Sequence, residues 1–187
     1  MALTIKHAGS DSTAVTSTMQ SPSGGRIVRV VPTVILGTTH DNDVMFDTVE
    51  IEDAVDSPGG ISRLMGIYVL DVDNENHDMD MVFMGKNSSL GTTGSAPSIS
   101  DADAKAANIC GVISLDFTDR QVSIGGATVT GFSNGSGQTV ANMPMLVQAE
   151  PGSTSIFLGA IAREEMAFGS STADLQIILH FEYLKWR

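Results

Sequence analysis

One serine in this chain has the spacing of a catalytic nucleophile. Residues 131–135 (GFSNG) match the G-x-S-x-G pattern of a nucleophile elbow, and Asp174 and His180 follow Ser133 in the Ser–Asp–His order of α/β-hydrolases. That mechanism needs a helix that starts at the serine and contributes to the oxyanion hole. Here the serine precedes Asn-Gly-Ser-Gly-Gln, and no parallel βαβ framework is visible. We therefore interpret the segment as a glycine-rich hairpin loop and expect no catalytic residues and no enzymatic activity.

An acidic turn offers a second kind of chemistry. Residues 71–80 (DVDNENHDMD) place Asp71, Asp73 and Glu75 at the first, third and fifth positions of a calcium-loop pattern. The sixth position is asparagine instead of glycine, the twelfth is valine instead of glutamate, and both flanks are strand-like, so the segment is not an EF-hand. Two interpretations stay open: a solvated acidic turn, or a weak cation site on these three carboxylates.

The remaining metal-binding and nucleophilic residue types are scattered. No two histidines have the i, i+4 or H-x-H spacing of a metal site, and the single cysteine has no second cysteine or adjacent histidine. We expect Cys110 to be a small buried residue near the end of a short helix. We expect no cofactor and no metal beyond the weak candidate above. The histidines are His7, His40, His77 and His180.

The net charge of the chain limits the classes of partner that it can bind. It has 187 residues with 22 Asp or Glu against 10 Lys or Arg, which gives a net charge of −12 with neutral histidines. A nucleic acid would be repelled by such a protein, so no nucleic-acid partner is expected. No apolar run approaches the roughly 18–20 residues that a membrane span needs. The 42% of hydrophobic residues is ordinary for a globular fold.

Many short apolar segments between turn signals indicate an all-β fold. Ser100 caps the start of a short alanine-rich segment, the single convincing helix, which Gly111 is expected to stop. We predict an antiparallel β-sandwich or jelly-roll-like domain with one short helix. Strands are expected at residues 26–36, 44–51, 61–72, 79–84, 112–117, 121–124, 127–130, 143–149, 155–162 and 174–184.

Some strands allow finer predictions. Residues 61–72 and 79–84 surround a polar turn and are expected to form a hairpin, while Pro32 must lie at an edge, bulge or break. Residues 156–162 (IFLGAIA) are apolar on both faces, which predicts a central strand covered on both sides. In the last strand Leu175, Ile177, Leu179, Phe181 and Tyr183 share one face, and Gln176, His180 and Glu182 share the other with Ile178.

Two segments are poor in apolar residues. Residues 10–25 are rich in Ser and Thr and end in two glycines, so residues 1–25 are predicted to form a flexible N-terminal arm. The arm is either a frayed terminus or a segment that becomes ordered against a neighbouring subunit. Residues 26–187 are predicted to form a single β-sandwich domain, with a possible subdivision at the Gly/Ser/Thr-rich segment 86–100.

Several segments together resemble small virion structural proteins of tailed bacteriophages. They are residues 100–111 (SDADAKAANICG), 112–119 (VISLDFTD) and 152–163 (GSTSIFLGAIAR), with 41–49 (DNDVMFDTV) and 60–83 fitting the same pattern. The resemblance covers most of the chain after about residue 25 and is a pattern of strands and turns. It implies a capsid decoration (cement) protein with no enzymatic activity, and it transfers no functional residue.

The resemblance also sets expectations for partners and location. It implies binding to the major capsid protein on the capsid exterior, self-association as a homo-oligomer such as a trimer, and synthesis in the cytoplasm of a bacterial host. The arm and the 86–100 segment are the expected contact elements. A tail or adsorption-apparatus protein of the same virion is the alternative.

Overall fold

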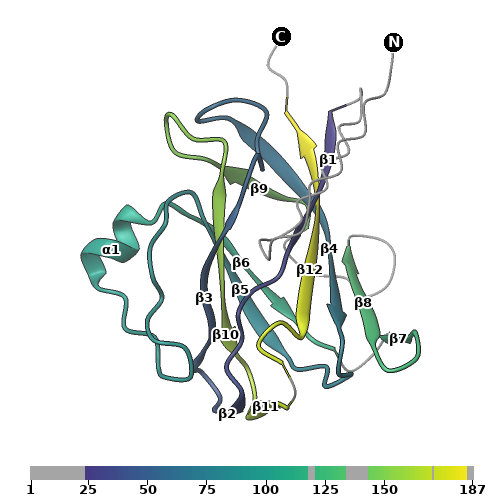
Figure 1. Cartoon of the computed structure of the whole chain (residues 1–187). Helices are drawn as coiled ribbons and strands as arrows, with labels where there is room; N and C mark the ends of the chain where they lie inside the picture. The colour runs from purple at the N-terminus through teal and green to yellow at the C-terminus, as the bar shows by residue number, and fades with distance from the viewer. Residues whose placement is uncertain (1–23, 118–120, 134–142, 170, 185–187) are drawn as a thin grey trace, which may run out of the picture.

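The computed structural model describes residues 24–117, 121–133, 143–169 and 171–184. Within these ranges the chain forms twelve strands and one helix (Figure 1). The strands are β1 (Gly25–Val30), β2 (Gly37–Thr39), β3 (Val44–Ile51), β4 (Ile61–Asp71), β5 (Met79–Met84), β6 (Ile109–Leu115), β7 (Gln121–Ser123), β8 (Thr128–Ser133), β9 (Met145–Gln148), β10 (Ile156–Ala162), β11 (Met166–Phe168) and β12 (Leu175–Tyr183), and the helix is α1 (Asp101–Ala106).

Ten of the described strands form two packed sheets, as the all-β prediction requires, and β2 and β11 form a separate two-stranded pair. The larger sheet has the order β1-β12-β4-β8-β7, with β9 in line with β8 on the same strand β4, and the smaller has the order β3-β10-β5-β6. If β8 and β9 count as one interrupted strand and the short β2, β7 and β11 are set aside, the eight main strands follow the orders 1-8-3-6 and 2-7-4-5. This is the strand order of a jelly roll, so the predicted fold class is confirmed.

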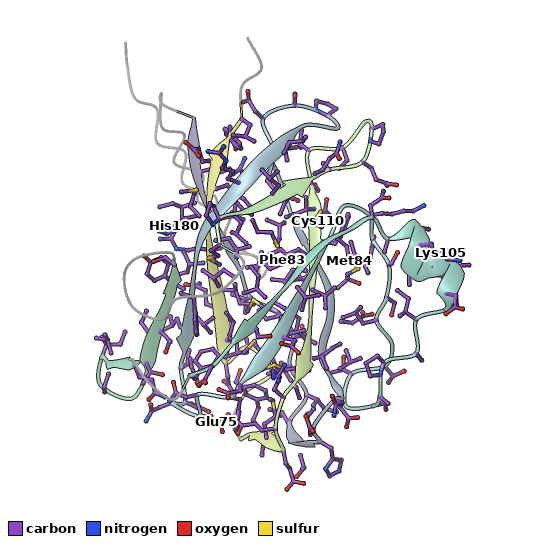
Figure 2. All side chains as sticks on the ribbon, turned by 180° about the vertical axis from the view of Figure 1, so that it is seen from behind. Glu75, Phe83, Met84, Lys105, Cys110 and His180 are labelled. Atoms are coloured by element: carbon purple, nitrogen blue, oxygen red, sulfur yellow. The ribbon has the colours of Figure 1, made fainter. Side chains whose placement is uncertain are left out.

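Alternation along the strands builds the core between the sheets. Leu175, Ile177, Leu179 and Phe181 of β12 are at most 3% exposed, and the residues between them are less buried. Met79, Met81 and Phe83 of β5 face them from the other sheet, and Figure 2 shows Phe83 in the middle of the molecule. The two-residue period read from the sequence therefore identified the inward side of both strands correctly.

The predicted hairpin between residues 61–72 and 79–84 is wrong. β4 lies in the larger sheet and β5 in the smaller one, so the turn between them connects the two layers. The two strands do share an apolar face, but these faces meet across the core instead of side by side in one sheet. Apolar alternation fixes which side of a strand is buried and leaves its hydrogen-bonded neighbours undetermined.

The ends of several elements also differ from the predictions. β1 ends at Val30, and Pro32 falls in the break that follows, as expected. Helix α1 ends at Ala106, well before Gly111, because Asn108 takes a positive φ of 51° and β6 begins at Ile109. The short pair β2 and β11 was not predicted. The predicted arm lies outside the described residues except for residues 24 and 25, and Gly25 already belongs to β1.

The 86–107 segment covers the outer side of the smaller sheet. Leu90 and Ala107 are buried in a second apolar cluster with Val44, Val82 and Met84, and Phe157 and Ile161 of β10 pack against it. β10 is a central strand between β3 and β5, and one of its faces packs in the core between the sheets while the other packs against this second cluster. This confirms the prediction for residues 156–162. Within each sheet, strands that precede residues 86–107 in the sequence alternate with strands that follow them, as in the order β3-β10-β5-β6.

A carboxylate holds this covering segment in place. Asp47 of β3 accepts hydrogen bonds from the Ser89 hydroxyl (2.7 Å) and from the backbone N–H of Leu90 (2.8 Å). Burial works against the ionised form, but these bonds and those from Thr48 outweigh it and lower the pKa of Asp47. The segment is therefore anchored to the sheet through a charged acceptor.

Replacing this anchor gives a pH-dependent prediction. Asp47→Ala is expected to lower the free energy of unfolding by about 1–2 kcal/mol at neutral pH, because two hydrogen bonds to a charged group are lost. The folded pKa is depressed, so this stabilisation is present above the unfolded value of about 3.9 and is lost as pH falls through the folded pKa. Denaturant titrations at several pH values test this: the variant and the wild type should converge in acid. The matched control is Glu52→Ala, which removes an exposed carboxylate just after the end of the same strand β3. An equal loss of stability in both variants would contradict the anchoring role of Asp47.

Candidate functional site

The structure separates the three residues of the hydrolase-like pattern. Ser133 in β8 and His180 in β12 both align with Gly66 of the intervening strand β4, so they lie on one side of the larger sheet. Asp174 precedes His180 by six residues along extended chain, which is a distance of about 20 Å. Its carboxylate is buried and accepts the backbone N–H of Ser171 at 3.0 Å. The three side chains do not form a triad; residues 134 and 135 lie outside the described residues.

His180 has an aromatic neighbour instead of a carboxylate. Its ring centroid is 4.8 Å from that of Tyr68, and the two planes are tilted by 40°. Burial first, and the charge of nearby Arg29 second, lower the pKa of His180. The neutral imidazole is therefore favoured at neutral pH, and it packs as part of the sheet surface.

In the acidic turn, Asp71 acts as a backbone anchor. Its side chain is 2% exposed, and its two oxygens accept the backbone N–H groups of residues 73, 74, 75 and 76 at 2.6–3.1 Å. Glu75 points elsewhere and accepts the N–H of Gly169 at 3.1 Å. Within the described residues, no group of three or more His, Cys, Asp or Glu side chains has the arrangement of a metal site. The weak cation candidate on Asp71, Asp73 and Glu75 therefore receives no geometric support here.

Two histidines pair with an acidic motif that the sequence analysis did not single out. His40 lies 3.1 Å from Glu165, and His77 lies 3.4 Å from Glu164. The signal in the sequence that could have found these pairs is the two adjacent glutamates between β10 and β11. These pairs connect segments at one end of the smaller sheet, because His40 precedes β3, His77 precedes β5 and both glutamates follow β10. His7 lies outside the described residues.

Cys110 lies where the two sheets meet at β6 and β9. Its Sγ is within 3.7 Å of the Gln148 carbonyl and accepts the Gln148 N–H at 3.5 Å. Burial raises the pKa of this thiol, so it is the neutral thiol at neutral pH. It lines a shallow cavity of about 500 Å³, beside which Ile109 and Leu146 are half exposed. The prediction of a buried cysteine at the helix end is wrong in both respects, because Cys110 is only partly buried and lies in β6.

The outward side of the larger sheet carries partly exposed apolar side chains on four neighbouring strands, β1, β12, β4 and β8. We call it the outer face and define it by the side chains of Ile27, Arg29, Tyr68, Leu70, Val129, Ile178 and His180. Strand register arranges them in rows: Ile27 beside His180, then Arg29, Ile178 and Tyr68, then Leu70 and Val129. All seven are of intermediate exposure. The one signal of this face in the sequence is Ile178, which lies among the polar residues of the last strand.

Two glycines, Gly131 and Gly66, leave room for neighbouring side chains of the outer face to approach one another. A Cβ on Gly131 would lie 2.8 Å from the Tyr68 ring, and Gly66 separates His180 from Ser133. The Tyr68 ring therefore lies against Gly131 of β8 and also contacts the His180 ring of β12. The Tyr68–His180 contact forms the centre of the outer face, whose apolar side chains can pack against a polypeptide segment.

Comparisons with known proteins assign no family. No protein-family description and no curated protein matches the chain. A chain from the structure of a marine algae virus of the order Picornavirales aligns over 94% of this chain and 73% of that chain, with 11% identity and a TM-score of 0.25. A TM-score of this size carries no argument. Among the described residues, no helix is long and apolar enough to cross a membrane.

Proposed function

We propose that this chain is a structural protein of a virion and that it attaches in many copies to the outside of a protein shell as a decoration or cement protein. The observation that carries the proposal is the strand order 1-8-3-6 and 2-7-4-5. Viral capsid domains use this jelly-roll architecture, as do lectins and cupins. Because one fold serves several functions, the choice among them rests on the surface and on the residues described above.

The surface chemistry supports an attachment role. A net charge of −12 suits a position away from packaged DNA, where lysine and arginine patches would be expected instead. The aligned Ser133 and His180 have no nearby Asp174 to complete a hydrolase triad. These features fit a stiff body that binds by shape.

Such a body stabilises a shell through repetition. Several weak contacts made at once give a high effective concentration, so the copies hold firmly without a tight single contact. Binding only the assembled shell favours that state by mass action. The major capsid protein is the proposed partner, and a homotrimer fits sites of threefold symmetry.

Quantitative mass spectrometry of purified virions tests the proposal. A shell decoration protein is expected at a copy number comparable to that of the major capsid subunit, and it should be released before the shell opens on mild denaturation. A small fraction of that number would instead indicate the tail or adsorption-apparatus alternative. Absence from washed particles, or a purified chain whose hydrolytic turnover disappears in Ser133→Ala, would overturn the proposal.

A further inference from the structure

The outward surfaces of the two sheets differ in whether the described chain covers them. Residues 86–107 lie over the smaller sheet, with Leu90 and Ala107 buried against Val44 and Met84. Figure 2 shows Met84 on the side of the smaller sheet that faces Lys105 of α1, and His180 on the opposite side of the molecule. No helix or strand among the described residues covers the outer face of the larger sheet (Figure 1). One apolar surface is closed by the chain itself, and its counterpart is left for another occupant.

The outer face is a poor binding surface for the acidic segments that make up much of this chain. It carries Arg29 and His180 and no carboxylate within its rows. The nearest acidic group on the same side is Glu182, which is paired with Arg63 at 3.4 Å. An apolar segment with little charge of its own fits this surface best, because it leaves no buried carboxylate unpaired.

Residues 1–23 are rich in Ser and Thr but carry little charge, and they precede the edge strand β1 of the larger sheet. They contain one acidic and one basic residue, and Leu3 and Ile5 alternate with Thr4 and Lys6. Their point of attachment is fixed, because the Gly24 carbonyl accepts the N–H of Tyr183 at the edge of the larger sheet. Gly24 therefore lies at the β1 edge of the larger sheet, three residues before Ile27 in the sequence.

The length of the segment is sufficient. The sheet is about 20 Å wide from β1 to β7, given a strand spacing of about 4.8 Å. Twenty-three residues span up to about 75 Å when extended, so they can cross the outer face and turn back. Covalent attachment at the edge also gives the segment a high local concentration over its own sheet. We propose that residues 1–23 dock on the outer face of the same chain, with Leu3 and Ile5 packed against its apolar rows.

Introducing a negative charge on either side of the segment tests which of its sides is buried. In the full chain, Ile5→Asp is expected to release the segment and to shift the NMR resonances of Tyr68, Val129 and Ile178. The matched control is Thr4→Asp, which adds the same charge one residue away on the other side of an extended segment. It should leave these resonances unchanged. Equal shifts from both variants, or none from either, would overturn the proposal.

A spin label then identifies the surface and the chain. Thr4→Cys is labelled in a Cys110→Ser background, in which the serine hydroxyl keeps a donor near the Gln148 carbonyl. Relaxation enhancement is expected at Leu70, Val129 and Ile178 when the label and the isotope are on one chain. Enhancement at Phe157 and Ile161 of the other sheet, or only between labelled and isotope-enriched chains mixed together, would reject docking within the chain. Because this readout needs only the purified protein, its failure is separate from failure of the virion proposal.

Discussion

Asp71→Ala is expected to lower the free energy of unfolding by about 3 kcal/mol or more, since four backbone N–H groups lose a charged acceptor. The side chain is 2% exposed, so water replaces the carboxylate incompletely. The turn that it organises carries the chain from the larger sheet to the smaller one, so its loss affects how the two layers are joined. Urea unfolding followed by circular dichroism measures the effect.

The control for Asp71→Ala is Asp56→Ala, which removes an exposed carboxylate from another turn. It should change the free energy of unfolding by less than about 0.5 kcal/mol. A loss at Asp71 no greater than at Asp56 would contradict the anchoring role. A calcium titration of the wild type separates the two interpretations of the turn, because a cation site predicts a rise in Tm with added calcium and the anchor predicts none.

The anchoring role of Asp71 had a signal in the sequence that a cation-loop comparison overlooks. Asn74 and Asn76 take positive φ values of 62° and 56°, and asparagine adopts this conformation more readily than most residues. An aspartate followed by alternate asparagines is thus consistent with a backbone loop wrapped around its carboxylate. The alternation of acidic residues alone does not distinguish ligands that converge on an ion from a carboxylate that collects amides.

Local patterns predicted local structure well. β3 and β5 have the predicted bounds, and Ser100 caps α1 by accepting the Asp103 N–H as its position suggested. These features depend on side-chain alternation and on hydrogen bonds within a few residues. The short strands β2 and β11 could not be found in this way, because each has three residues and is defined by its partner far along the chain.

Strand neighbours and the outer face depended on long-range contacts. β12 lies between β1 and β4, and β10 lies between β3 and β5, although each is far from its neighbours in sequence. The sequence assigned Ile178 to the polar side of its strand, but only the register places it beside Arg29 and Tyr68. A docking surface made of single residues from several strands has no contiguous motif to recognise.

The junction between the two sheets near Gly85 gives a second prediction of large effect. A Cβ at this position would lie 2.6 Å from the Gln148 carbonyl oxygen of β9 and 3.3 Å from the Asn108 Cβ. The nearest atom belongs to the backbone, so the clash is relieved only by moving β9 away from the end of β5. Gly85→Ala is therefore expected to lower the free energy of unfolding by about 2–3 kcal/mol.

Gly126→Ala is the matched control, because a Cβ there meets no atom within 4 Å and its φ is not positive. This variant should be neutral or gain up to about 1 kcal/mol, since alanine restricts the unfolded chain more than glycine does. Thermal unfolding of both variants at one protein concentration provides the comparison. Indistinguishable Tm values would show that β9 moves freely relative to β5 and β6. In that case the Cys110–Gln148 contacts would not hold β9 against β6 at this edge. The two sheets would then not form the rigid body that the virion proposal requires.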